Sequence, residues 1–149
     1  MDVAWSSSLF ALVGGALITV QVGSNTELKK GFGEPLAALL LNYLLGFIIV
    51  LSCTLARHDG TLSFPKAMHT PWWGWLGGAA GAIYGLTAII MGSQIGAARL
   101  TALVVTGQLV CSVILDHFGW LSFEVHTAGI GRIGGCALMI LGLTLIAKY

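Results

Sequence analysis

The sequence predicts an all-α integral membrane protein with five transmembrane helices. Of its 149 residues, 56% are hydrophobic and only 9% are charged, whereas a soluble domain carries roughly 25% charged residues. The mean hydropathy is +0.90. Five apolar segments reach the length of about 20 residues that a helix needs to cross a bilayer. The net charge of +1 gives no reason to expect a nucleic acid as a partner.

The first two spans are expected at residues 9–28 and 36–56. The N-terminal residues 1–8 contain no Lys or Arg, so the first apolar run is expected to be a retained span rather than a cleaved signal. Its second half turns semipolar from Gln21 to Glu27. Pro35 suits the first position of the second helix, where a missing N–H costs nothing. Asn42 is the only strongly polar residue inside the second span.

The third span is expected at residues 73–95, after an aqueous loop. Trp72, Trp73 and Trp75 at its start indicate a membrane interface. Small residues recur in this span at steps of three or four, which places them on one helix face. Glycines on such a face let another backbone approach closely. The glycines expected to pack a neighbouring helix are Gly74, Gly78, Gly81 and Gly85.

The last two spans are expected at residues 98–118 and 128–147, joined by a short polar loop. Gly131 and Gly135 lie on one face of the last span and are expected to pack another helix. The whole chain is interpreted as a single membrane domain, residues 1–149. The three cysteines lie in apolar runs and share no ligand-like spacing with the histidines, so we expect neither a metal site nor a cofactor.

Polar residues recur every fourth position in the fourth span. Gln108, Ser112 and Asp116 therefore lie along one helix face. In lipid such a face is expected to turn toward other helices or a water-filled cavity, because polar groups in hydrocarbon are costly. This stripe marks the first place to look for function.

The distribution of basic residues leaves the orientation of the chain undecided. Five spans place the termini on opposite sides of the membrane. Three of the seven Lys and Arg residues fall on the side of the N-terminus and four on the other. Orientation follows this bias, so a near-balanced chain is expected to insert both ways. An antiparallel homodimer would then supply the inverted repeats from which many transporters are built.

Two segments resemble the YdcZ-type family of the drug/metabolite transporter superfamily. Asn25-Thr-Glu-Leu28 with Gly33-Glu-Pro-Leu-Ala37 and Gly46 is similar to its first hairpin, and Gly107-Gln-Leu109, Ser112 and Asp116-His-Phe-Gly119 are similar to its fourth helix. The resemblance implies a half-size, five-helix transporter unit in the inner membrane that works as an antiparallel pair. The four-helix multidrug members of the superfamily carry a proton-coupling glutamate in mid-first-helix. Residues 11–18 contain no carboxylate, so their proton-for-cation exchange does not carry over.

The candidate site residues fall into two groups, each with a structural alternative. Amides, hydroxyls and phenols at membrane depth can bind a polar substrate, or they can hydrogen-bond neighbouring helices. The candidates for substrate binding are Gln21, Asn25, Asn42, Tyr84, Gln94, Gln108 and Ser112. The candidates for coupling or gating are Glu27, Asp116 and His117, because a buried carboxylate or a histidine can carry a proton near neutral pH. Their structural alternatives are an interfacial carboxylate screened by lysines and a capping network.

The favoured function is a secondary transporter, an exporter of small metabolites or drug-like compounds that works by alternating access in an antiparallel dimer. The alternative is a non-transporting membrane subunit that stabilises or regulates a partner protein. No nucleophile–base pair, paired carboxylates or phosphate-binding loop is found in the sequence, so an enzyme is not expected.

Overall fold

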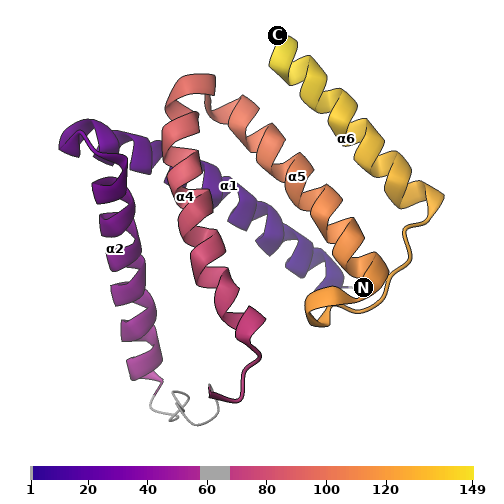
Figure 1. The fold of residues 1–149 in the computed structure, drawn as a ribbon, viewed down its shortest axis with the longest axis horizontal. Helices are drawn as coiled ribbons and strands as arrows, with labels where there is room; N and C mark the ends of the chain where they lie inside the picture. The colour runs from indigo at the N-terminus through magenta and orange to yellow at the C-terminus, as the bar shows by residue number, and fades with distance from the viewer. Residues whose placement is uncertain (1, 58–67) are drawn as a thin grey trace. The chain divides into compact units, whose positions relative to one another are not determined.

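The computed structural model describes residues 2–57 and 68–149, and it is helical throughout its five long segments (Figure 1). The long helices are α1 (Asp2–Phe32), α2 (Pro35–Ala56), α4 (Leu76–Ile95), α5 (Ala97–Phe118) and α6 (Ile130–Lys148), and the short 3-10 helices are η1 (Trp72–Trp75) and η2 (Trp120–Ser122). All five long helices are apolar and long enough to cross a membrane. The predicted fold class and the number of spans are confirmed.

Helix α1 is longer at both ends than the expected span of residues 9–28. Its semipolar end remains helical because Lys29 and Lys30 occupy the last turn, where positive charge interacts favourably with the helix dipole. Gly33 then stops the helix with a φ of +75°, and its N–H donates to the Lys29 carbonyl at 2.8 Å. This is the left-handed helix end that glycine tolerates best. Residues 58–67 of the expected aqueous loop lie outside the described residues.

The chain divides into two compact units, Met1–Ser93 and Gln94–Tyr149. The first unit holds α1, α2 and nearly all of α4. Its core consists of Ala38 and Leu39 from α2 with Ile89 from α4, and Leu28 and Leu86 pack against them. This small cluster therefore joins all three helices of the unit.

Helices α2 and α4 approach closely where α4 carries glycine. The Tyr43 hydroxyl donates a hydrogen bond to the carbonyl of Gly81. A Cβ atom added at Gly85 would lie 2.6 Å from Leu39 Cδ1 and 2.8 Å from Tyr43 Oη, which is closer than real contacts allow. These two glycines thus provide the surface on which α2 packs.

The other four glycines expected to pack helices have different surroundings. A Cβ at Gly74 would lie 2.7 Å from Thr70 Cγ2, within its own segment. A Cβ at Gly78, Gly131 or Gly135 would meet no atom of the described residues within 4 Å. Within one chain, close helix contact is therefore observed at only part of the predicted glycine faces.

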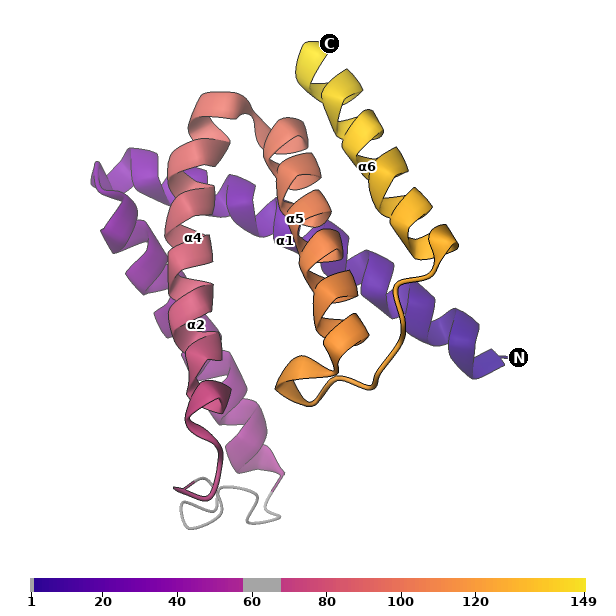
Figure 2. The same cartoon turned by 45° about the vertical axis from the view of Figure 1, so that its right-hand side comes forward.

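The second unit is the antiparallel hairpin of α5 and α6 (Figures 1 and 2). Helix α5 ends at Gly119, whose φ is +63° and whose N–H donates to the Leu115 carbonyl. A Cβ at Gly119 would also lie 2.7 Å from Val125 Cγ2. Glycine is thus required here both by the backbone and by the space that the returning loop leaves.

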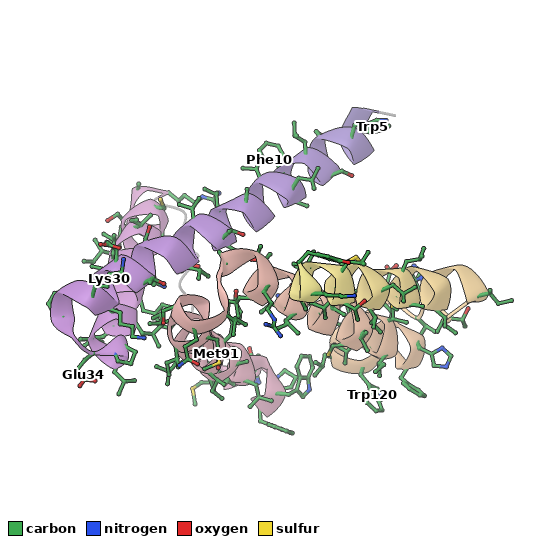
Figure 3. The ribbon with its side chains drawn as sticks, turned by 90° about the horizontal axis from the view of Figure 1, so that it is seen from above. Trp5, Phe10, Lys30, Glu34, Met91 and Trp120 are labelled. Carbon is green, nitrogen blue, oxygen red and sulfur yellow. The ribbon has the colours of Figure 1, made fainter. Side chains whose placement is uncertain are left out.

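Figure 3 shows labelled side chains at two helix ends and along the first half of α1. Lys30 and Glu34 lie at the turn between α1 and α2, and Trp120 directly follows α5. Trp5 and Phe10 project from the first half of α1 and are 75% and 77% exposed within the chain. Because the helix bodies are apolar, surface exposed in this way is suited to lipid or to a second chain.

Candidate polar groove in the membrane

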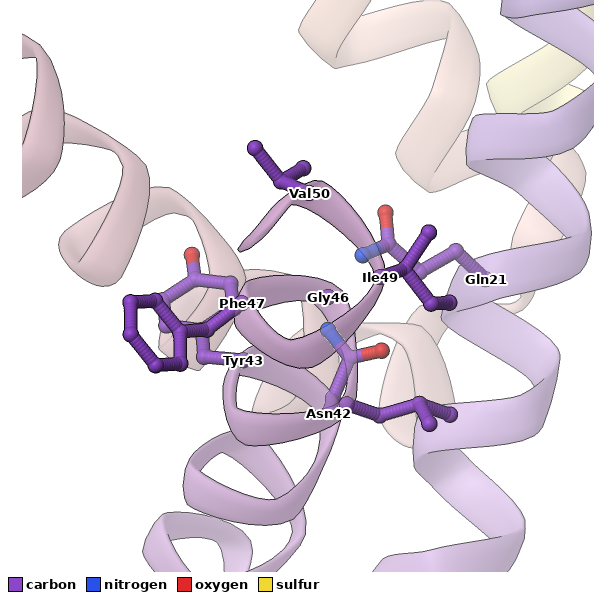
Figure 4. Close-up of a pocket in the computed structure, with 8 residues that line it drawn as sticks. Gln21, Asn42, Tyr43, Gly46, Phe47, Ile49 and Val50 are labelled. Carbon is purple, nitrogen blue, oxygen red and sulfur yellow. The ribbon is translucent and has the colours of Figure 1, made fainter. Parts of the chain in front are cut away.

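A groove of about 560 Å³ lies in the first unit, along one side of α2 (Figure 4). Helix α1 contributes Gln21, and α2 contributes the remaining wall: Asn42, Tyr43, Leu45, Gly46, Phe47, Ile49 and Val50. Its volume falls within the range of roughly 300–1,000 Å³ that is typical of small-molecule sites. Most of its wall is apolar, with the polar groups concentrated in two carboxamides.

Helical periodicity sets the polar wall of this groove. Asn42, Gly46 and Ile49 are four and three residues apart along α2, so they follow one another on the same face. The Gln21 side chain reaches from α1 toward that face (Figure 4). Gly46 widens the groove, since a Cβ added there would meet no described atom within 4 Å.

The two amides of the groove have no hydrogen-bond partner among the residues that the structure describes. Asn42 lies seven residues after the start of α2, about 10 Å along the helix axis. Gln21 lies eleven residues before the end of α1, about 16 Å along it. The hydrocarbon core is about 30 Å thick, so a bilayer that these two helices cross would place both amides at membrane depth.

An unpaired amide at this depth carries a free-energy cost. Transfer of such a group from water to an apolar medium without a hydrogen bond costs roughly 2–7 kcal/mol. The hydroxyl groups nearby avoid that cost: Thr26 and Thr54 each donate to a backbone carbonyl of their own helix at 2.8 Å. Gln21 and Asn42 are therefore the groups of this unit that a polar occupant of the groove would satisfy.

Asn25, one helical turn from Gln21, is buried rather than open to the groove. Its side chain is 4% exposed, and its Oδ1 is the one buried side-chain polar atom without a partner among the described residues. Nearby, Lys29 of α1 donates from Nζ to Ser93 Oγ of α4 at 3.1 Å. The predicted pair of amides on α1 is thus split between the helix contact and the groove.

A second hollow of about 330 Å³ continues the groove toward the end of α2. The two share Ile49 and Val50, and the second also touches Cys53, Thr54 and Arg57. Arg57 is the residue that caps α2. The side of α2 therefore changes from amide-lined to aliphatic to cationic along its length.

The remaining candidates for substrate binding lie outside the groove. Tyr84 is half-buried on α4, and Gln94 is exposed near the end of that helix. Gln108 is exposed on α5, in the other unit, and has no hydrogen bond to any described residue. Ser112 donates to the Leu109 carbonyl of its own helix at 2.9 Å, which satisfies its hydroxyl.

Glu27 lies on the surface of the chain. Its carboxylate pairs with Lys30 Nζ at 2.8 Å, and the two side chains are 74% and 66% exposed. The proton-carrier interpretation requires the Glu27 carboxylate to be buried. Within a single chain this burial is not observed, and the arrangement is the screened carboxylate that was the structural alternative.

Asp116 and His117 take part in the contacts that close the loop between α5 and α6. Arg132 Nη1 donates to Asp116 Oδ2 at 3.1 Å and to the His126 carbonyl at 3.3 Å. The His126 N–H donates to the Asp116 carbonyl at 2.9 Å. His117 Nδ1 accepts a hydrogen bond from the Ala128 N–H at 3.1 Å. The pair thus lies in a network that connects the helix end to the returning chain.

Two of these features were not singled out from the sequence. Arg132 was considered only for its charge, although it opens a helix antiparallel to the one that Asp116 ends. Opposite charges at the joined ends of a helical hairpin are a signal that could have suggested their pairing. Gly46 was noted only within the family resemblance, because the space beside a glycine depends on the neighbouring helix. No group of three or more His, Cys, Asp or Glu able to hold a metal occurs among the described residues.

Comparison with known proteins reveals similarity along most of the chain. Residues 7–145 match the family described as "Putative inner membrane exporter, YdcZ". The chain is 26% identical over 140 residues to "Inner membrane protein YdcZ" of Escherichia coli (strain K12), and the match covers 93% of each chain. No solved structure matches this chain.

Proposed function

The chain belongs to the YdcZ family of inner-membrane proteins, and from this premise we propose that it exports small metabolites or drug-like compounds as a secondary transporter. It is a multi-pass protein of the inner membrane, and its family is one of transporters rather than enzymes. The observation that carries the proposal is the groove beside α2, where the amides of Gln21 and Asn42 face open space at membrane depth. Polar groups that a membrane protein leaves unsatisfied at this depth commonly mark a substrate pathway.

The proposed mechanism is alternating access in an antiparallel homodimer. The near-balanced distribution of Lys and Arg residues supports insertion in both orientations. Two oppositely oriented copies would form the inverted repeats whose relative movement opens a central site to each side in turn. Gln108 of α5, which has no partner among the described residues, is proposed to line that site together with Gln21 and Asn42.

Helix α6 is proposed to hold the dimer together. None of its residues is buried within the chain. Gly131 and Gly135 have open space at the position of a Cβ, so a helix of a second chain has room to approach. This assignment leaves α1, α2, α4 and α5 to surround the pathway.

Flux through purified protein in proteoliposomes tests the transport function. We expect saturable, protein-dependent flux of a substrate first found by a thermal-shift screen of small metabolites, since a ligand that binds the native state raises its apparent stability. Asn42→Ala and Gln108→Ala are each expected to reduce this flux at least tenfold. Thr87→Ala is the matched control, because the Thr87 hydroxyl donates to the Ile83 carbonyl of its own helix, and its flux should stay at the wild-type level.

The alternative, a non-transporting subunit, makes the opposite prediction. Flux that is indistinguishable from protein-free liposomes for every ligand found in the screen would contradict transport. So would undiminished flux in both amide variants, because the pathway would then lie elsewhere in the chain.

A further inference from the structure

We infer that the groove beside α2 takes an uncharged, amphipathic molecule that carries both hydrogen-bond donors and acceptors. This inference rests on the proposed transport function and names the class of substrate. It is drawn from the chemistry of the eight lining residues, from their depth in the membrane and from the space beside Gly46.

The two amides of the groove are uncharged, and each can both donate and accept hydrogen bonds. Gln21 and Asn42 each offer an NH₂ group with two donors and a carbonyl oxygen with two acceptor positions. None of the lining residues is Asp, Glu, His, Lys or Arg. A ligand with an amide, a urea or a cluster of hydroxyls would satisfy both side chains, whereas a pure donor or a pure acceptor would leave half of each amide unpaired.

Because this lining contains no charged side chain, the groove is unsuited to anionic and to cationic ligands. An ion that leaves water for an apolar site without an opposite charge loses its hydration and gains little in return. Arg57 belongs to the second hollow and lies fifteen positions after Asn42 in the sequence, which is about 22 Å along a helix. A ligand bound at the amides is therefore beyond the reach of that guanidinium.

The rest of the groove lining favours a ligand with an apolar body. Apart from the two amides and Gly46, the lining presents mostly apolar surface, from Leu45, Phe47, Ile49, Val50 and the ring of Tyr43. Aliphatic walls with a few convergent polar groups are typical of sites for small organic molecules. Gly46 lies in the centre of this lining, between the amide at position 42 and the aliphatic residues at 49 and 50, so its missing side chain provides part of the bound volume.

Binding of three matched probes to the purified protein tests the inference. N-acetylphenylalaninamide is neutral with two amides, N-acetylphenylalanine has the same body with a carboxylate, and phenylalaninamide has it with an ammonium group. Isothermal titration calorimetry at about pH 5.5, where the carboxylate and the ammonium group are both ionised, should show the neutral probe binding at least tenfold more tightly than either ion. Equal or tighter binding of an ion, or no binding of any of the three, would overturn the inference.

Gly46→Leu locates the binding in the groove. The variant should fold, because the added side chain meets open space in the chain, and it should lose binding of the neutral probe at least tenfold. Gly77→Leu on α4 is the matched control, as Gly77 also has no described atom within 4 Å of an added Cβ, and it should bind normally. Unchanged binding in Gly46→Leu would overturn the inference.

Two further measurements distinguish a ligand site from an interface between chains, and ligand binding from transport. The oligomeric state of each variant is measured by light scattering in detergent. A loss of dimer in Gly46→Leu would show that the groove is an interface between chains and would overturn the ligand site. Specific binding of the neutral probe without protein-dependent flux would instead remove the proposed transport function and leave the groove as a ligand site.

Discussion

At the scale of single residues, the polar side chains of the first unit differ in how they are satisfied. Threonine hydroxyls reach a carbonyl of the preceding helical turn, as Thr26 and Thr54 do. The Tyr43 hydroxyl reaches across to Gly81 on α4. A carboxamide has two donors and an acceptor to satisfy, and the helix backbone offers it no such set. The amides of Gln21 and Asn42, unlike that of the buried Asn25, are open to the groove and can be satisfied by a molecule bound there.

Replacing Asn42 with leucine is expected to stabilise the protein and to abolish its function. The half-buried Asn42 amide has no partner among the described residues, and mutational data put the cost of an unpaired amide in an apolar environment at about 1–3 kcal/mol. Asn42→Leu should therefore raise the midpoint of thermal unfolding in lipid nanodiscs and eliminate flux. Thr87→Val provides the control, since it removes a hydroxyl that is already satisfied. A lower midpoint in Asn42→Leu would mean that the amide has a protein partner.

At the scale of secondary-structure elements, the contact between α2 and α4 depends on where glycine lies. Gly78 and Gly85 are seven residues apart on one face of α4. An added Cβ would collide with Leu39 and Tyr43 at Gly85 and would meet nothing at Gly78 within the described residues. The two positions therefore share a helix face but differ in their contact with α2.

Leucine at these two positions should have unequal effects on stability. Gly85→Leu forces α2 and α4 apart and disturbs the core of Leu39 and Ile89, and overpacking of this kind typically costs about 1–3 kcal/mol. Gly78→Leu should leave the unfolding free energy close to that of the wild type. Thermal unfolding of both variants in the same lipid is the measurement. An equal loss at Gly78 would indicate that a second chain covers that part of the face.

The sequence predicted the helices well because lipid makes their signal simple: a long apolar run forms a helix to satisfy its backbone. It predicted the end of α1 less well, since residues 29–31 are two lysines and a glycine and yet remain helical up to the cap at Gly33. Periodicity placed Gln21 and Asn25 on one face, yet it could not say which of them packs. That depends on the angle between α1 and α2, and so does the alignment of Gln21 with Asn42.

At the scale of the whole molecule, the charge distribution bears on how the chain inserts. On one side of the predicted membrane lie Lys29, Lys30, Arg99 and Lys148, and on the other lie Arg57, Lys66 and Arg132. A difference of one basic residue is small compared with the biases that set orientation. The antiparallel dimer proposed above requires both orientations to be populated, so the position of the C-terminus provides a direct test of it.

Reporters fused after Tyr149 should be active on both sides of the membrane. We expect a fluorescent protein, which folds in the cytoplasm, and an alkaline phosphatase, which is active in the periplasm, each to give signal in separate fusions of the wild-type chain. Two lysines appended after Tyr149 raise the count on that side from four to six and should retain the C-terminus in the cytoplasm. Lys30→Ser with Lys148→Ser lowers it to two and should favour the reverse orientation.

The chain with two added lysines and the double serine variant should each lose flux when expressed alone, because only one orientation would then be present. Co-expression of these two variants should restore flux. Lys30 and Lys148 are suitable for this change since both side chains are on the surface of the chain, whereas Lys29 bonds to Ser93. Wild-type reporters active on one side only would contradict the antiparallel homodimer. Full flux from either biased variant alone would contradict it as well, because a single orientation would then suffice for transport.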